Sequence, residues 1–422
     1  MAMNVRAWTL ALAAGVATLA ACGRRHGRTG QGPYADMVAD AMPKIEKAVG
    51  VPFKSTPRLE VRTREQVRDF LLKKFDEQSP AAELAGQQAA YRAFGLIPDT
   101  LELRPFLVRL LTEQIVGYYD PSAKVLYIVK GAPDDLVGVT VTHELVHALQ
   151  DQYVNLDSLQ SATGDNDRQM AAQAVIEGEA TYEQMAIMTG GQNIATLLPG
   201  GWDRVRELIR ENESSQPVFA SAPPAIQEEL LFPYLAGAEF IREFKQHFPT
   251  RLPLTDIPVS TAQVLHPSKF FGDSVDVPVT VTLPRTAGQT VYENDLGEFD
   301  TRLLLYRYLS DQTTAMNAAQ GWDGDRYRIL REPAGTAVVW VTVWHTNVDA
   351  AEFVTALGQA MKNRYLAPAP VVESGGRRIY RGRGHTVVIT PFTIGARDAV
   401  MLVDAPAGSA TDLLDRAAIK LR

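Results

Sequence analysis

Apolar residues recur at helical spacing through the first part of the chain, from residue 34 to residue 116. In residues 64–78, one helical face carries the apolar side chains of Val67, Phe70, Leu71 and Phe75. The same spacing continues through residues 80–94 and 101–116, and Gly95 and Pro98 interrupt it between them. We therefore expect residues 34–116 to be helical.

The pattern changes near residue 117. Gly117 to Pro121 is typical of a turn, and residues 125–129 form a β-branched and aromatic run that predicts a strand. Helical spacing returns in residues 134–153, 167–188 and 225–247. Residues 34–275 are therefore expected to form one mainly helical domain with a small edge sheet.

A different pattern begins after about residue 275. Apolar runs at residues 338–343, 385–390 and 398–403 predict strands, and residues 349–364 and 411–421 predict helices. We interpret residues 276–422 as a separate C-terminal α+β domain whose role the sequence does not reveal. The fold class expected for the whole chain is therefore α+β.

Composition narrows the classes of protein. Of 422 residues, 46% are hydrophobic and 22% are charged, which is typical of a globular protein with well-filled cores. Lys and Arg total 42 against 49 Asp and Glu, a net charge of −7, so we expect no nucleic-acid partner. A single cysteine excludes an internal disulfide and a thiolate-rich metal site.

That cysteine lies at the end of an N-terminal export signal. Arg6 precedes an apolar stretch at residues 8–21, which is short for a membrane span and typical of a signal peptide. The sequence Leu-Ala-Ala-Cys at residues 19–22 resembles the bacterial lipobox. The resemblance implies a signal peptide at 1–21, lipid on Cys22, a tether at 22–33 and an extracytoplasmic body in the bacterial cell envelope. Gly23 favours the outer membrane. The alternative is Ala-x-Ala cleavage with an incidental thiol.

The strongest chemical motif lies in the helix expected at residues 134–153. It reads His143-Glu144-Leu145-Val146-His147. Residues four apart share a helical face, so both imidazoles can reach one zinc ion while Glu144 acts as a general base. In the alternative interpretation the two histidines only form hydrogen bonds, and a third ligand would distinguish the two.

A third ligand is suggested by residues 175–182, Val-Ile-Glu-Gly-Glu-Ala-Thr-Tyr. This stretch resembles the second metal-binding helix of the gluzincin metallopeptidases. The resemblance implies that Glu177 completes a site for one Zn2+ per chain, and that Gly178 lets this helix approach the histidine helix. Glu179 is the alternative ligand, and a solvated glutamate helix is the alternative without a site.

The gluzincin resemblance leaves the support of the histidines open. Thr181 occupies the place where thermolysin-like members have an aspartate that holds a histidine ligand. Asp151 or Glu183 could fill that role.

A candidate for stabilising the transition state lies further along the chain. Residues 232–240 resemble the Tyr-x-x-Gly helix of aminopeptidase-like gluzincins, which implies that Tyr234 donates to the oxyanion. A core tyrosine is the alternative interpretation, and His266 is a competing donor.

The resemblance covers roughly residues 117–250, and the wider pattern looks like uncharacterised bacterial lipoprotein-type metallopeptidases. It implies a membrane-anchored zinc peptidase whose metal-activated water cleaves a protein or peptide substrate. The Gly-Ala-Met-Glu-Asn strand of aminopeptidases is absent, so an endopeptidase is expected, with residues 125–129 as the edge strand that pairs with substrate. The alternatives are a chaperone-like envelope assembly module and an aminopeptidase.

Two weaker patterns lie in the C-terminal half. Residues 375–383 are basic and glycine-rich, which fits either a solvated hairpin or contact with anionic lipid headgroups. Trp322, Trp340 and Trp344 fit either a hydrophobic core or a recognition groove.

Overall fold

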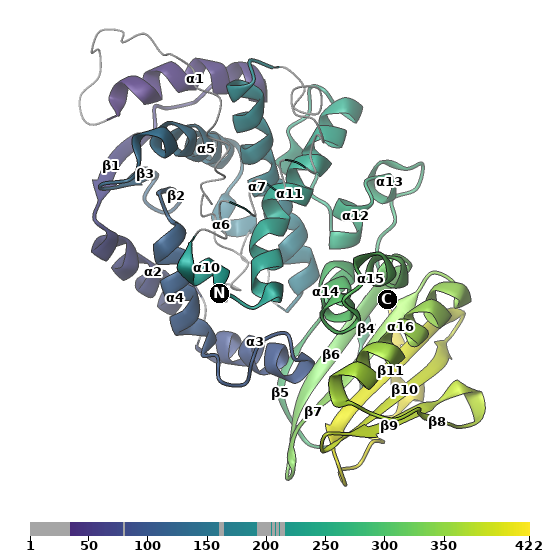
Figure 1. The fold of residues 1–422 in the computed structure, drawn as a ribbon. Helices are drawn as coiled ribbons and strands as arrows, with labels where there is room; N and C mark the ends of the chain where they lie inside the picture. Colours follow the sequence, from purple (N-terminus) through teal and green to yellow (C-terminus); the bar gives the residue numbers. More distant parts are fainter. Residues whose placement is uncertain are drawn as a thin grey trace.

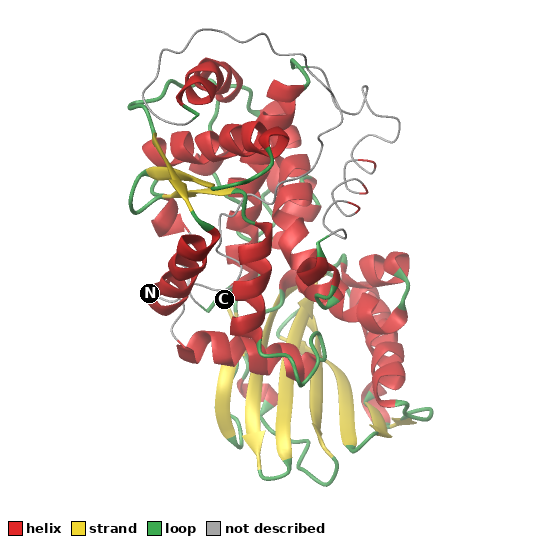
Figure 2. Cartoon of the chain, turned by 60° about the vertical axis from the view of Figure 1, so that its left-hand side comes forward, coloured by secondary structure: helices red, strands yellow, loops and turns green. Residues whose placement is uncertain are grey.

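The computed structural model describes residues 34–78, 81–159, 164–191 and 216–422, together with Arg204, Glu207 and Glu211. The expected signal peptide, Cys22 and the tether lie outside these residues. The described chain is α+β, as predicted, with a mainly helical first part and a seven-stranded sheet in the second (Figure 1). Figure 2 shows most helices gathered in one part of the molecule and the large sheet in the other.

The helices of the first part follow the predicted ranges closely, but residues 58–62, expected to be helical, form a strand, so that part of the prediction is wrong. Val67 and Leu71, on the apolar face expected for residues 64–78, are buried. The helices are α1 (Ala35–Val49), α2 (Arg64–Gln78), α3 (Ala81–Phe94), α4 (Leu103–Gln114), α5 (Asp134–Tyr153), α6 (Leu156–Leu159), α7 (Asn166–Met188), α10 (Pro217–Ala220), α11 (Pro224–His247), α12 (Thr261–Leu265) and α13 (Ser268–Phe271).

A small sheet accompanies these helices. Its strands are β1 (Arg58–Arg62), β2 (Gly117–Asp120) and β3 (Val125–Val129), in the order β1-β3-β2. The strand predicted at residues 125–129 is therefore central and fully buried, and its expected role as the edge strand is wrong. Most of the turn expected at residues 117–121 is strand β2, which forms an edge instead.

The large sheet has the order β5-β6-β7-β11-β10-β9-β8. Trp322, Trp340 and Trp344 are buried, so they belong to the core and do not line a groove. One face of the sheet packs on α16, where Phe353 contacts both Trp340 and Trp344. The elements are β4 (Val281–Thr282), β5 (Gln289–Asn294), α14 (Gly297–Leu309), α15 (Gln312–Ala319), β6 (Trp322–Glu332), β7 (Gly335–Trp344), α16 (Asn347–Tyr365), β8 (Val371–Val372), β9 (Arg378–Gly382), β10 (His385–Ile394), β11 (Arg397–Pro406) and β12 (Lys420–Leu421).

The helix predicted at residues 411–421 is wrong. This stretch contains a short 3-10 turn, Arg416–Ala418, followed by β12, which pairs with β4. Leu413 and Ile419 are buried against the face of the sheet opposite α16. Strand pairing and burial of these two side chains therefore override the local helical spacing.

The core is continuous between the two halves of the chain. Phe94, at the end of α3, packs edge-on against Tyr327 of β6 and Trp340 of β7, with ring centroids 5.1 and 5.6 Å apart. The boundary predicted between residues 275 and 276 therefore separates two parts of the chain that share buried contacts.

The N-terminus of α7 is also held by the second half of the chain. The side chain of Asn294, at the end of β5, accepts a hydrogen bond from the Asn166 backbone N–H at 3.1 Å and donates to the Asn166 side chain at 2.9 Å. Asp295 accepts from the Asp167 N–H at 2.8 Å. Side chains more than a hundred residues away in the sequence thus satisfy two of the free N–H groups of the first turn, and Asp165 caps the Arg168 N–H locally at 2.9 Å.

Replacing Asn294 by alanine is expected to lower the free energy of unfolding by about 2 kcal/mol, because it removes a helix cap and leaves the Asn166 side chain buried without this partner. Urea denaturation measures the change. Asn317→Ala, at an exposed position of α15, is the control and should change stability by less than about 0.5 kcal/mol. Equal stability of the two variants would contradict the capping role.

Candidate metal centre

Helix α5 is placed by its apolar side. Val141, Leu145, Val146 and Leu149 are buried in one cluster with Leu126 and Ile128 of β3. This packing fixes the rotation of α5 about its axis. His143 and His147, four residues apart, then share another face of the same helix, as the sequence predicts.

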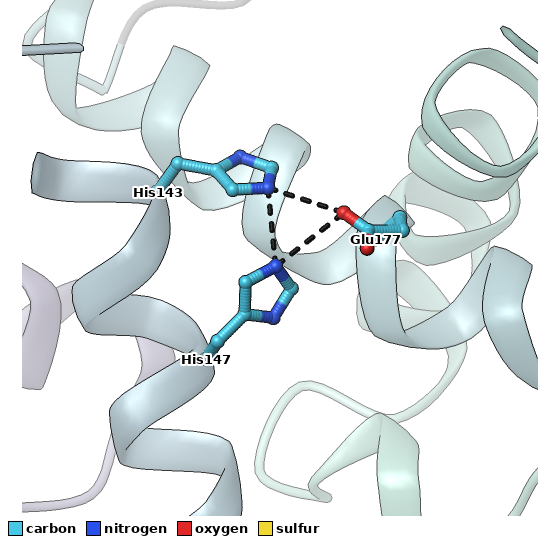
Figure 3. A group of neighbouring side chains, drawn as sticks. All are labelled: His143, His147 and Glu177. Carbon is cyan, nitrogen blue, oxygen red and sulfur yellow. Dashed lines mark hydrogen bonds and ion pairs between the residues drawn. The ribbon is translucent and has the colours of Figure 1, made fainter. Parts of the chain in front are cut away.

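His143, His147 and Glu177 converge on one point, and we call these three residues the metal centre (Figure 3). The two Nε2 atoms of the histidines lie 3.1 Å apart. The Oε2 atom of Glu177, from α7, lies 3.2 Å from Nε2 of His143 and 3.4 Å from Nε2 of His147. The carboxylate expected as the third ligand therefore lies beside both histidines.

The electrostatics of the metal centre favour a cation. Burial lowers the pKa of His147, but the Glu177 carboxylate more than offsets this and raises the pKa to about 9. Burial raises the pKa of Glu177, but the His147 and His143 imidazoles outweigh it and hold the pKa below its ordinary value. Two imidazole nitrogens and one carboxylate oxygen are also the donors of catalytic zinc sites, so these residues fit a zinc ion.

Two glutamines orient the histidine ligands. Oε1 of Gln184 lies 3.0 Å from Nδ1 of His143, and Oε1 of Gln150 lies 2.8 Å from Nδ1 of His147. An amide oxygen can only accept, so each Nδ1 carries the proton and each Nε2 presents its lone pair to the metal position. Sequence analysis did not identify either glutamine.

The two acidic residues expected in this supporting role lie elsewhere. Asp151 accepts hydrogen bonds from the Tyr119 hydroxyl, at 2.8 Å, and from Lys124. Glu183 pairs with Lys245 of α11. Both carboxylates are thus bound by cations or hydroxyls, and the expectation that either holds a histidine ligand is wrong.

Removing the amide of Gln184 is expected to weaken zinc binding. The Gln184→Ala variant leaves Nδ1 of His143 without its acceptor, and the loss of such a partner typically costs about 10- to 100-fold in metal affinity. Competition with a fluorescent chelator measures the affinity. Gln359→Ala, at an exposed position of α16, is the matched control. Unchanged affinity in Gln184→Ala would show that the amide does not orient the ligand.

Glu179, the alternative ligand, does not reach the metal centre. Its Oε2 accepts a hydrogen bond from Nε2 of Gln150 at 2.9 Å, and burial raises its pKa. Glu177 is instead held in place by Gln173, whose Nε2 donates to Oε1 at 3.0 Å. Glu177 therefore offers Oε2 to the metal position, and Glu179 supports Gln150.

Glu144 lies on the β2 side of the metal centre. Its side chain is fully buried, and its Oε2 accepts a hydrogen bond from the Tyr119 backbone N–H at 2.6 Å. Oε1 has no hydrogen-bond partner among the described residues. Burial raises the pKa of this carboxyl group. Oε2 of Glu144 is thus held by the backbone of β2, whereas Oε1 has no hydrogen-bond partner among the described residues.

The glycine expected to bring two helices together does so, but with a different neighbour. A Cβ atom on Gly178 of α7 would lie closer than 3.0 Å to backbone atoms of Gly237 in α11, and one on Gly237 would meet the backbone of Ala174. The close approach is therefore between α7 and α11, not between α7 and the histidine helix α5. The glycines of the two sequence motifs meet at this crossing.

Tyr234 lies one turn before Gly237 on α11. Its ring is buried and faces the ring of His143, with the two centroids 6.0 Å apart at 28°. The competing donor, His266, instead hydrogen-bonds Glu298 of α14 at 2.8 Å and lies 3.0 Å from Nη2 of Arg302. Of the two candidates for the oxyanion donor, Tyr234 is therefore the one in contact with the metal centre.

Comparisons with known proteins identify a matching family model and a similar solved structure. A family model described as a domain of unknown function (DUF8575) matches residues 285–415, a segment without any residue of the metal centre. No curated protein matches the chain. Among solved structures, the chain is similar to "a putative hydrolase with a novel fold from Chloroflexus aurantiacus", at 17% identity and a TM-score of 0.34, over 56% of this chain and 87% of that one. A likeness at this identity and TM-score supports no conclusion about the chemistry of this chain.

The described helices were also compared with the requirements of a membrane span. Among them, none is both long enough and apolar enough to cross a bilayer.

Proposed function

We propose that the chain is a zinc-dependent endopeptidase of the gluzincin type. The observation that carries the proposal is the convergence of His143, His147 and Glu177 on one point, with the buried carboxylate of Glu144 beside them. The three candidate ligands come from two helices that pack against each other, so the site is built into the fold and does not depend on a loop. The sequence resemblance to gluzincins supports the same assignment.

The proposed mechanism assigns one task to each residue. Zinc, when bound, supplies Lewis acidity that makes a water more acidic and a peptide carbonyl more electrophilic. Glu144 takes a proton from the attacking water through its free Oε1 and passes it to the leaving amine. The Tyr119 N–H holds the other oxygen of Glu144 throughout. The phenol of Tyr234 donates a hydrogen bond to the negative charge that develops on the carbonyl oxygen.

The edge of β2 is the proposed track for the substrate backbone. The Val129 N–H donates a hydrogen bond to the Val116 carbonyl at 2.8 Å. Backbone groups along an antiparallel pair face the partner strand at every second residue, so the N–H and C=O of Tyr118 face β3, whereas those of Gly117 and Tyr119 face away from it. The outward Tyr119 N–H is held by Glu144, so the Tyr119 carbonyl on the same side is the group proposed to pair with the substrate. An extended peptide paired there would present its scissile bond to the metal centre along its length, which suits cleavage within a chain.

The location is also a proposal. We infer from the sequence that Cys22 carries lipid and anchors the protein in a bacterial envelope, with the outer membrane favoured by Gly23. Protein or peptide substrates of the same compartment follow from this placement, and the acidic composition argues against nucleic acid as a partner.

Metal analysis combined with a cleavage assay tests the proposal. The mature chain should bind one zinc per molecule, and cleavage of casein or a peptide library should stop with a chelator and resume with added zinc. The His143→Ala variant should lose both properties. One equivalent of zinc without cleavage of any library peptide would favour the chaperone-like scaffold, and release of single residues from aminoacyl chromogenic substrates would indicate an aminopeptidase.

A further inference from the structure

A cavity that shares no residue with the metal centre lies between α3 and one end of the large sheet. Its volume is about 750 Å³, a size typical of small-molecule sites. The walls are α3, the ends of β7, β10 and β11, and the last turn of α16. Figure 1 shows α3 beside the large sheet. We call this cavity the basic cavity after the charged side chains that line it, which are Arg92, Arg364, Arg383, His385, Asp99 and Asp404.

Two of the three arginines are already neutralised. Arg92 forms an ion pair with Glu102 at 2.8 Å. Arg364 pairs with Asp404 at 3.5 Å and donates to the Ala93 carbonyl at 2.6 Å. Arg383 is exposed and forms no ion pair or hydrogen bond with the described residues. Its guanidinium is therefore the cation in the cavity wall that is left for a ligand.

The backbone places Arg383 at some energetic cost. Arg383 and Gly384 form the two-residue turn between β9 and β10, and their φ angles are 43° and 74°. Such turns favour Asn or Gly at the first position, because a side chain disfavours positive φ. An arginine here is not explained by the turn itself, whereas a role for its guanidinium in the cavity explains it.

His385, next in the chain, is oriented by a buried carboxylate. Its Nδ1 lies 2.8 Å from Oδ1 of Asp404, which is 2% exposed and also accepts a hydrogen bond from the Tyr365 hydroxyl. The Tyr365 ring stacks on the imidazole with centroids 4.8 Å apart. These contacts fix the ring and commit Nδ1 to Asp404, so Nε2 is the nitrogen left for a ligand.

We propose that the basic cavity binds a small ligand through one oxyanion group, a carboxylate or a phosphate, held between Arg383 and His385. The guanidinium fork matches two oxygens of either group, and Nε2 of His385 donates a hydrogen bond to the same group when the ring carries both protons. The site shares no residue with the metal centre, so the inference goes beyond the proposed peptidase and does not depend on it.

Isothermal titration calorimetry, which measures the affinity of the full mature chain for added ligands, tests this inference. One arm uses sodium phosphate, and the other uses N-acetyl-dialanine with a free carboxylate, compared with its C-terminal amide. At least one oxyanion should bind saturably and the amide should not. Arg383→Gln and His385→Gln should each weaken binding about tenfold or more, because each removes a charge-assisted hydrogen bond.

Two variants serve as controls for the binding measurement. Arg381→Gln changes an exposed arginine of the same hairpin that does not line the cavity, and it should bind like the wild type. His143→Ala should also bind normally, which separates this site from the metal centre. Binding of phosphate alone or of the carboxylate alone identifies the ligand class. Failure of both to bind, or an equal loss of affinity in Arg381→Gln, would overturn the proposal.

Discussion

Replacing Glu144 by glutamine is expected to abolish peptide hydrolysis while leaving one zinc per chain. The amide keeps the size of the side chain and cannot accept a proton from water, and loss of a general base costs about a thousandfold or more in rate. Glu144 forms no hydrogen bond with His143, His147 or Glu177, so the exchange leaves the hydrogen bonds of these three residues in place. The measurements are kcat/KM on a cleaved peptide and the zinc content of the same preparation.

Glu352→Gln, the same exchange at an exposed position of α16, controls for the substitution itself and should retain full activity. If Glu144→Gln cleaved the peptide at the wild-type rate, Glu144 would not be the base. If it lost zinc as well as activity, the defect would lie in the metal centre, and the variant would say nothing about proton transfer.

Replacing Gly178 by alanine should be severely destabilising. The added methyl group would overlap backbone atoms of Gly237, which cannot rotate away as a side chain could, so α7 and α11 must separate. We expect the free energy of unfolding to fall by about 3 kcal/mol, at the upper end for overpacking. Because Glu177 is the neighbouring residue, the same shift moves a ligand, and zinc affinity should fall too.

Gly138→Ala provides the matched control within α5. A Cβ atom there meets nothing within 4 Å, so this exchange should leave stability unchanged or raise it by up to about 1 kcal/mol through helix propensity. Urea denaturation of both variants, with and without zinc, gives the comparison. A Gly178→Ala chain as stable as the wild type would mean that the helices do not need this close contact.

The parts of the metal centre that could be predicted are those encoded locally. The spacing of His143 and His147 defines a helical face without any tertiary information, and α5 has the predicted bounds. Glu177 required a resemblance, because nothing local marks a carboxylate thirty positions away as a ligand.

The supporting residues could not be predicted in the same way. An amide carries no signature of metal binding, so Gln150 and Gln184 passed unnoticed. Gln184 lies seven residues after Glu177, on the same face of α7. This spacing, together with the need for an acceptor at Nδ1 of His143, is the signal that could have identified it. The partner of Gly178 and the strand order β1-β3-β2 depend on contacts distant in sequence, which periodicity does not contain.

The caps on α7 have a consequence for the order in which the protein is made. Asn294 follows its partner Asn166 by 128 residues, so Asp165 caps the Arg168 N–H locally long before the N–H groups of Asn166 and Asp167 meet their side-chain partners. At ordinary rates of translation this interval is roughly ten seconds. The first turn of the helix that carries Glu177 therefore receives two of its caps only when the second half of the chain arrives, and a nascent chain arrested before residue 294 should hold this turn less stably although every candidate ligand is already present.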